Sequence, residues 1–318
     1  MQARQADLHT LFQSGGRAFP ETVWPILNLL AAQAGHLTPA QCRTIMAQMD
    51  ISLEGLMVRL LPLAGAYARV PVSRFVVGAV IQAQSGDDPQ DYGLYLGANL
   101  ELAGQSLDTA VHAEQAAVVN ACHQGAGTVR TLAVSAAPCG YCRQFLNELA
   151  DAERMEVIIS PGINQQEDLH LGLLELLPHA FGPRDLNQPA GFMAPGRKPI
   201  PLQLKESAVD ELVLGALSAA ADTYAPYTGN AAGCAVRTRE GQVFFGRYVE
   251  SAAFNPSIGP LTAALINSNM ARAAAPLDLT RVVLVERPTT ISQRGAVEKM
   301  ASSLGKGLKL EYHEARPA

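Results

Sequence analysis

The chain has 318 residues, of which 48% are hydrophobic and 17% are charged, and its formal net charge is −5. This composition excludes a disordered chain and predicts a compact protein, long enough for two domains with separate buried cores. The negative charge offers no general basic surface for a phosphate backbone, so we expect no nucleic-acid partner.

The N-terminal segment, residues 1–50, is predicted to be helical. Its apolar stretch at 23–34 is too short for a membrane span and lacks the flanks of a signal peptide. We therefore expect no membrane association and a cytoplasmic protein. Residues 21–33 form one predicted short helix, and residues 38–41 (Thr-Pro-Ala-Gln) begin another with an N-cap, a proline and a capping-box partner.

A longer predicted helix begins at Ser52, and we expect Pro62 to kink or break it. Turn-forming residues at 85–89 then join two predicted strands as an antiparallel hairpin. The next elements alternate between strand and helix, which is typical of a mixed sheet with helices on both faces. The strands are placed at 74–82, 92–97, 129–135 and 155–160, and the helices at 109–124 and from Cys139 onward.

Residues 183–205 are rich in proline and glycine and are predicted to be an interdomain linker. Beyond it the order helix, hairpin, helix, strand, helix, strand returns, and residues 246–250 match residues 97–101. A repeat of this length predicts two copies of one fold, at 51–182 and 206–318. In the second copy the helices are placed at 206–223, 261–274 and 291–303, and the strands at 233–239, 242–248, 281–286 and 308–313.

Five cysteines are scattered along the chain, and their odd number and wide spacing argue against a disulfide framework. Only Cys139 and Cys142 lie close together, at the start of a predicted helix, where both thiols can reach one metal ion. The positive end of that helix favours thiolates, the form that binds zinc. With His112 they give three zinc ligands, and three ligands leave one position for water or substrate.

Glu114 lies two residues after the histidine of this set. A carboxylate there can take a proton from a zinc-bound water molecule and return it to the substrate. The arrangement H-x-E followed by P-C-x-x-C is the signature of zinc deaminases. A Cys-x-x-Cys pair by itself is more often a redox pair or half of a structural zinc site, but the sequence shows neither a thioredoxin-like context nor a second ligand pair.

On these residues the chain resembles a cytidine deaminase of the long, two-domain, homodimeric type, from about residue 53 to the C-terminus. The resemblance implies two three-layer α/β/α domains after a small helical N-terminal segment. It also implies zinc-dependent hydrolysis of cytidine and 2′-deoxycytidine to uridine and 2′-deoxyuridine, with release of ammonia, in pyrimidine salvage. The stretches that carry it are 73–78, 97–101, 111–115, 137–145, 180–183 and 251–260.

The resemblance also implies roles for five substrate-binding residues. Asn99 and Glu101 are expected to bind ribose hydroxyls, and Phe75 to pack beside the nucleoside. The backbone of Ala113 is expected to contact the base. Phe181 is similar to the aromatic residue that reaches into the neighbouring subunit's site in this family, which implies a homodimer.

Two positions depart from the family pattern. Val76 stands where many relatives have asparagine, and Ala137 where some have threonine, and these departures bear on affinity more than on the reaction. The second copy has lost the chemistry, because residues 260–263 read Pro-Leu-Thr-Ala and residues 288–292 read Pro-Thr-Thr-Ile-Ser. We therefore expect it to serve packing and the dimer interface.

Two other functions remain open on the sequence. A nucleotide or polynucleotide deaminase would use the same zinc chemistry but would need phosphate-binding basic residues. A zinc-binding scaffold without activity would have no use for Glu114. Glu101 by itself would be a solvated or capping carboxylate, and Phe75 and Phe181 would by default be core aromatic residues.

Overall fold

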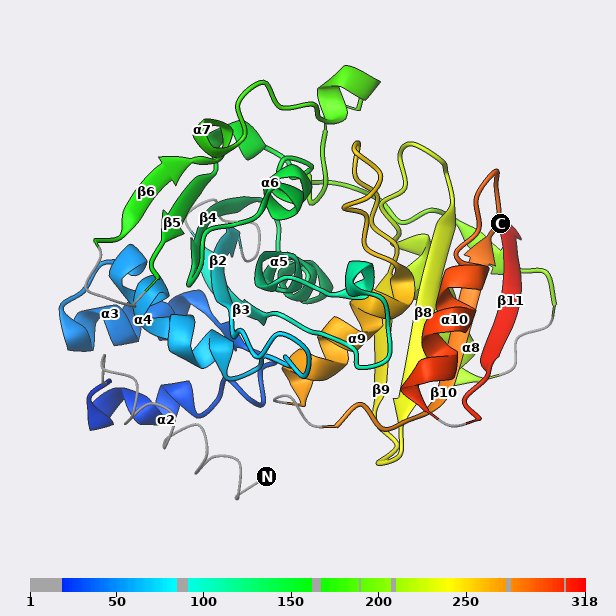
Figure 1. Ribbon diagram of the computed structural model, residues 1–318, viewed down its shortest axis with the longest axis horizontal. Helices are drawn as coiled ribbons and strands as arrows, with labels where there is room; N and C mark the ends of the chain where they lie inside the picture. Colours follow the sequence, from blue (N-terminus) through cyan, green and yellow to red (C-terminus); the bar gives the residue numbers. More distant parts are fainter. Residues whose placement is uncertain are drawn as a thin grey trace.

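Two β-sheets, one from each half of the chain, lie side by side in the computed structural model, and helices cover their faces (Figure 1). In the chain that the structure describes, no helix is long and apolar enough to cross a membrane. The described residues are 19–84, 91–161, 167–188, 190–206, 210–272, 276–305 and 307–318.

The first sheet has the strand order β1-β3-β2-β4-β5-β6. Its centre is the predicted hairpin, in which β2 pairs antiparallel with β3, while β4 pairs antiparallel with β2 and parallel with β5. The predicted turn at 85–89 lies outside the described residues. The strands are β1 (His36–Leu37), β2 (Gly78–Gln84), β3 (Tyr92–Ala98), β4 (Val129–Val134), β5 (Glu156–Ile159) and β6 (Leu169–Gly172).

The second sheet has the strand order β7-β11-β10-β8-β9. Its four strands β9-β8-β10-β11 repeat the order and the directions of β3-β2-β4-β5, since β8 is antiparallel to β9 and β10, and β10 is parallel to β11. This correspondence confirms two copies of one mixed α/β fold. The strands are β7 (Leu202–Leu204), β8 (Ala231–Thr238), β9 (Val243–Arg247), β10 (Leu279–Arg287) and β11 (Leu310–Pro317).

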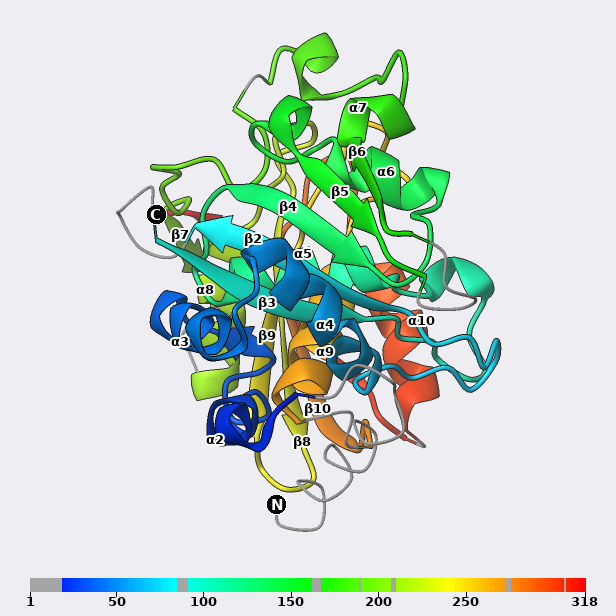
Figure 2. The same ribbon diagram turned by 90° about the vertical axis from the view of Figure 1, so that its left-hand side faces the viewer.

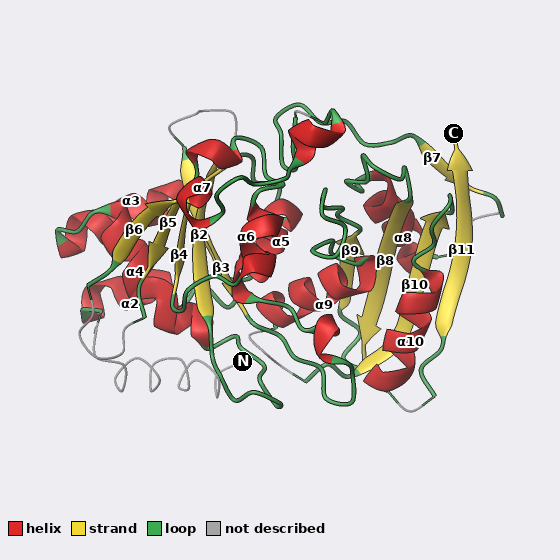
Figure 3. Cartoon of the chain, turned by 45° about the horizontal axis from the view of Figure 1, so that its top comes forward, coloured by secondary structure: helices red, strands yellow, loops and turns green. Residues whose placement is uncertain are grey.

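Helices lie on both faces of each sheet, as predicted. In Figure 2, α3 and α4 lie on the outer side of the first sheet, and Figure 3 shows α5 and α9 between the two sheets, where they contact each other. The α-helices are α2 (Trp24–Leu27), α3 (Pro39–Met49), α4 (Leu53–Gly65), α5 (Ala113–His123), α6 (Gly140–Leu146), α7 (Leu173–Leu176), α8 (Glu211–Ala221), α9 (Pro260–Ala271) and α10 (Arg294–Leu304). The 3-10 turns are η1 (Glu21–Val23), η2 (Leu107–Thr109), η3 (Ala152–Arg154) and η4 (Pro183–Leu186).

Glycine sets the close approach of the inner helix α5 to its sheet. A Cβ atom at Gly97 on β3 would lie 2.1 Å from the backbone nitrogen of Ala117, so only glycine fits there. On the opposite face, a Cβ atom at Gly78 would lie 2.3 Å from the carbonyl oxygen of Leu61 on α4. The close contact at Gly97 therefore fixes the position of α5 on β3, and with it the position of His112 at the start of that helix.

The second half repeats this packing. A Cβ atom at Gly246 on β9 would lie 2.1 Å from the backbone nitrogen of Ala264 on α9. A Cβ atom at Gly233 on β8 would lie 2.3 Å from the backbone nitrogen of Ala220 on α8. Both copies thus use glycine at matching register positions to hold one helix on each face of the sheet.

The bounds of several predicted elements differ in the structure; the helix predicted at 109–124 begins at Ala113, for example, and the strand predicted at 308–313 runs from Leu310 to Pro317. Three further differences have a local cause. The helix predicted at 21–33 ends at Leu27, because the chain continues in tighter turns in which the amide of Leu30 bonds the carbonyl of Leu27. Helix α4 continues through Pro62, which lies in its last turn, so the helix does not break there; the other predicted outcome, a kink at this proline, stays a prediction. The strand predicted from residue 74 begins at Gly78, because Arg74 has the left-handed φ of 57° and interrupts extended pairing.

The segment predicted as a linker is held by both halves, since its strand β7 pairs antiparallel with β11 of the second sheet and its Phe192 is bonded to the first half. Phe192 is buried, its carbonyl accepts a hydrogen bond from Ala150, and its amide donates one to Glu148. The domain limits at 182 and 206 remain predictions. Parts of three predicted elements fall outside the described residues, namely 1–18 of the N-terminal segment, 207–209 of the helix at 206–223, and 273–274 of the helix at 261–274.

Candidate functional site

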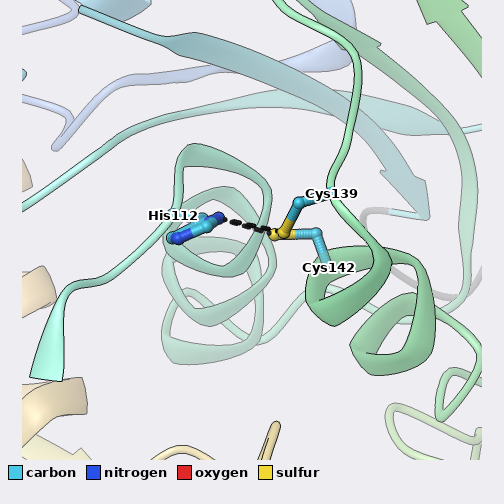
Figure 4. Close-up of side chains that lie close together, drawn as sticks. All are labelled: His112, Cys139 and Cys142. Carbon is cyan, nitrogen blue, oxygen red and sulfur yellow. Dashed lines mark hydrogen bonds between the residues drawn. The ribbon is translucent and has the colours of Figure 1, made fainter. Parts of the chain in front are cut away.

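Two helix N-termini meet at the proposed metal ligands. His112 is the N-cap of α5, Cys139 is the N-cap of α6, and Cys142 follows in the first turn of α6. The Nδ1 atom of His112 lies 3.4 Å from Sγ of Cys139 and 3.2 Å from Sγ of Cys142 (Figure 4). The ligand atoms of the three side chains all lie within 4.8 Å of one another.

This geometry fits a zinc ion. With Zn–S bonds of about 2.3 Å and Zn–N bonds of about 2.0–2.1 Å in a tetrahedron, ligand nitrogen and sulfur atoms lie about 3.5 Å apart. The distances from the His112 nitrogen to both sulfur atoms are close to that value. Within the part of the chain that the structure describes, no other group of three histidine, cysteine or acidic side chains has such spacing. Three protein ligands leave a fourth position open to water or substrate.

The two thiols differ in acidity. Their mutual hydrogen bond lowers the pKa of Cys139 to about 5, with help from nearby backbone N–H groups and His112, although burial opposes the shift. The same hydrogen bond, together with burial, raises the pKa of Cys142. Cys139 is therefore the readier thiolate, and a divalent cation is needed to stabilise both thiolates at once.

Glu114 lies beside these ligands in the first turn of α5. Its side chain is only 4% exposed, and its carboxyl group shares a hydrogen bond with the thiol of Cys142. Burial raises the pKa of Glu114, although its own backbone N–H and the neighbouring His112 oppose the shift. A carboxyl group that holds its proton more firmly than usual can both accept and return a proton near neutral pH.

Glu101 holds a loop at the edge of the first sheet. Its Oε2 atom accepts hydrogen bonds from the backbone nitrogens of Val72, at 2.9 Å, and Ser73, at 3.0 Å. Although desolvation opposes the shift, these hydrogen bonds lower the pKa of Glu101, so the group is an anion at neutral pH. The capping contact that the residue type alone suggests is therefore present.

Asn99 holds the same loop farther along. Its Nδ2 donates to the carbonyl of Phe75 at 2.8 Å, and its Oδ1 accepts from the backbone nitrogen of Val77 at 3.0 Å. The Phe75 ring is consequently held outward, with 58% of the residue exposed. Phe75 is thus not a core aromatic residue.

Ala113 and Phe181 lie in different surroundings. Ala113 is fully buried in the first turn of α5, next to the histidine ligand. Phe181 is 48% exposed, and its carbonyl accepts hydrogen bonds from Gln144 at 2.7 Å and Asn147 at 3.1 Å, in and just after the C-terminal part of α6. Phe181 is therefore a surface residue fixed to the helix that carries Cys142.

The second half places other residues at the corresponding positions. The bridge between Val249 and Ile258 matches the bridge between Leu100 and Val111, so Gly259 takes the place of His112. By the same register Leu261 takes the place of Glu114, and the strand pairing puts Thr289 and Ser292 at the places of the two cysteines. The lost ligands that the sequence indicates are thus lost in space as well.

A buried carboxylate occupies this part of the second half. Glu286 accepts hydrogen bonds from the backbone nitrogen of Gln293 at 2.6 Å, from Ser292 Oγ at 2.7 Å and from Asn230 Nδ2 at 2.9 Å. Glu250, which matches Glu101, still caps its loop by accepting from the backbone nitrogen of Tyr227 at 2.9 Å. Loop capping by this glutamate therefore belongs to the fold and does not require a catalytic site.

Two residues near the ligands were not singled out from the sequence. Gln115 is buried, and its Oε1 accepts a hydrogen bond from the backbone nitrogen of His112 at 3.3 Å, a contact that its capping-box spacing could have indicated. Arg143 donates from Nε to the carbonyl of Pro138 at 2.8 Å and from Nη1 to Leu176 at 2.8 Å. It ties the cysteine turn to α7, and no sequence signal points to that contact.

Comparison with known proteins agrees with this site. Residues 52–159 and residues 173–298 each match a family model described as the zinc-binding region of cytidine and deoxycytidylate deaminases. The chain is 38% identical to a cytidine deaminase of Photobacterium profundum over 277 residues, which are 87% of this chain and 88% of the relative. It is 39% identical to one from Shewanella baltica over 254 residues, which are 80% of each chain.

A crystal structure of cytidine deaminase from Burkholderia pseudomallei is 28% identical and covers 40% of this chain and 98% of its own, with a TM-score of 0.34. Two matched family regions and long relatives of this identity decide the assignment. The chain belongs to the cytidine and deoxycytidylate deaminase family, whose members are zinc-binding hydrolases that act on C–N bonds.

We expect Cys139→Ala to lose most of the bound zinc and to lower the thermal unfolding temperature, because two remaining ligands bind the metal poorly and metal binding stabilises the fold. Elemental analysis after gel filtration, with calorimetry, measures both effects. Cys122→Ala is the matched control, since Cys122 lies in α5 but outside the ligand group. Full zinc occupancy in Cys139→Ala would contradict the assigned ligand set.

Proposed function

We propose that the enzyme hydrolyses the C4–N bond of cytidine and 2′-deoxycytidine, giving uridine and 2′-deoxyuridine with release of ammonia, in pyrimidine salvage. The observation that supports this most is the buried Glu114 carboxyl group beside three converging metal ligands. Its position suits proton transfer rather than metal binding. The named relatives that the chain matches are cytidine deaminases.

In the proposed mechanism, three residues hold the metal ion and a fourth transfers protons. Zinc held by His112, Cys139 and Cys142 would lower the pKa of a water molecule and so supply a nucleophile near neutral pH. Glu114 accepts the proton of that water and delivers it to N3 of the pyrimidine as the oxygen adds to C4. A second transfer through Glu114 moves the proton of the new C4 hydroxyl group to the amino group. The C4–N bond then breaks, ammonia leaves and a C4 carbonyl group remains. One water molecule is consumed for each ammonia released.

The loop that precedes β2 supports the proposed nucleoside contacts. Glu101 and Asn99 fix this loop through hydrogen bonds to its backbone, and we propose that their side chains also bind ribose hydroxyls. The exposed Phe75 ring offers a flat apolar surface for the nucleoside, and the backbone of Ala113, next to His112, is the proposed contact for the base. An anionic Glu101 near the sugar disfavours a phosphorylated substrate.

We expect cytidine and 2′-deoxycytidine to be turned over at least about a hundredfold faster than cytidine monophosphate or single-stranded DNA, because carboxylate–phosphate repulsion costs several kcal/mol. The loss of absorbance on conversion of cytosine to uracil, followed at equal substrate concentrations, gives the rates. Preferred turnover of either phosphorylated substrate would support the nucleotide or polynucleotide deaminase instead.

We expect Glu114→Gln to retain zinc and fold normally while its turnover falls by several orders of magnitude, on the order of 10²–10⁴ or more, because proton transfer is removed. Glu54→Gln is the matched control, since Glu54 occupies the same second position of a helix, α4, but is exposed. Zinc content and cytidine turnover are measured for both variants. Wild-type turnover in Glu114→Gln would exclude the mechanism and favour a zinc scaffold.

We also propose a cytoplasmic homodimer in which Phe181 reaches the partner's site. The homodimer is supported by the exposed side chain of Phe181 and by the hydrogen bonds that fix the Phe181 carbonyl to Gln144 and Asn147. The cytoplasmic location is supported by the five free cysteines, which suit a reducing compartment. We expect light scattering to give twice the chain mass. Phe181→Ala should raise KM for cytidine about tenfold at unchanged zinc content, the cost of a lost aromatic contact. A fully active monomer would contradict the shared site.

A further inference from the structure

A loop of the second half lies against the helix that carries Cys142. This contact loop, residues 251–257, connects the bridge at Val249 to helix α9. It is braced internally, because the Ser251 amide donates to Ser257 Oγ at 3.0 Å and the Phe254 amide donates to the Ser251 carbonyl at 2.9 Å. A loop closed in this way can act as a rigid support.

The first contact is made by a residue that stands between the two cysteine ligands in the sequence. Tyr141, the residue before Cys142, donates its hydroxyl hydrogen bond to the carbonyl of Asn255 in the contact loop. Its ring lies 6.1 Å from the His112 ring. Gln115, which accepts from the His112 amide, also reaches the loop through a long contact of 3.5 Å to the carbonyl of Pro256. The loop thus touches the first turns of both ligand-bearing helices.

The second contact lies just beyond the other end of α6. Glu148 is fully buried, and its Oε2 atom accepts a hydrogen bond from the Ala252 amide at 2.7 Å. Its Oε1 atom accepts from the hydroxyls of Tyr224 at 2.7 Å and Tyr227 at 2.6 Å. All three donors belong to the second half, so these hydrogen bonds tie a carboxylate of the first half to the second half. Burying a carboxylate is costly unless its oxygens are satisfied in this way.

The duplication explains where the contact loop lies. Since Gly246 matches Gly97, the contact loop corresponds to residues 102–110 of the first half. That first-half loop contacts the second half in turn, because Gln105 hydrogen-bonds Ser303 near the end of α10. Each copy therefore extends the same loop onto the other copy, but only in the first half does the contacted helix carry metal ligands.

We propose that Tyr141 and Glu148 are positioning residues through which the contact loop of the non-catalytic half holds α6, and thereby Cys139 and Cys142, in metal-binding geometry. The loop holds the helix at both ends, and the sulfur atoms lie on its first turn. This gives the second half a role at the metal site although it holds no ligand. The inference requires the metal site but is independent of which cytosine compound is the substrate.

The test is the rate at which the zinc-loaded full-length enzyme releases zinc to a chromogenic chelator, well below its unfolding temperature. We expect Tyr141→Phe and Glu148→Gln each to speed release about tenfold, the lower range for residues that orient metal ligands. Cobalt-substituted Tyr141→Phe should also show a changed visible absorption band, which reports ligand geometry directly.

Tyr312→Phe is the matched control. Tyr312 lies on β11 of the second half, donates its hydroxyl to the Glu286 carboxylate at 3.3 Å and packs its ring under the Arg294 guanidinium, so both of these partners belong to the second half. In Figure 1, β11 lies on the far side of the second sheet from α6. We expect it to release zinc at the wild-type rate. If Tyr141→Phe releases zinc no faster than Tyr312→Phe and keeps the wild-type cobalt spectrum, the proposal is overturned, whatever Glu148→Gln does to folding.

Discussion

The convergence of two helix N-termini is the constraint on which the rest of this structure depends. An imidazole nitrogen and two sulfur atoms can surround one metal only if α5 and α6 begin within a few ångströms of each other. The start of α5 is set by its close packing on Gly97, and the turn before α6 is held by Arg143. Two positive helix ends then favour the thiolates and place Glu114 beside them.

Burial gives Glu114 its chemical character. Other glutamates of this chain are buried or partly buried, but Glu101, Glu148, Glu250 and Glu286 each accept hydrogen bonds from backbone or side-chain donors of the fold. Glu114 instead shares its carboxyl group with a ligand thiol. A carboxyl group in such surroundings has a raised pKa and remains available for proton transfer.

The duplication shows which parts of the fold are separable from catalysis. Sheet order, glycine-mediated helix packing and the loop-capping glutamate are the same in both halves. The metal ligands are present only in the first, and in the second the polar network around Glu286 takes their place. The second half nevertheless has the contact loop that meets α6. Although this half lacks metal ligands of its own, it still contacts the helix that carries the cysteine ligands of the first half.

The sequence determined what depends on local spacing: the order of most strands and helices, the repeat, and the three residues that could hold a metal. Three-residue spacing at a helix start already puts Cys139 and Cys142 on one side. The sequence pattern gave the wrong strand start at Arg74, because the left-handed φ of that residue ends the extended run. Only the tertiary structure decided that Glu148 and Tyr141 meet residues more than a hundred positions away. Such contacts follow from how two sheets pack, and a buried carboxylate has no periodicity by which its partners can be read in advance.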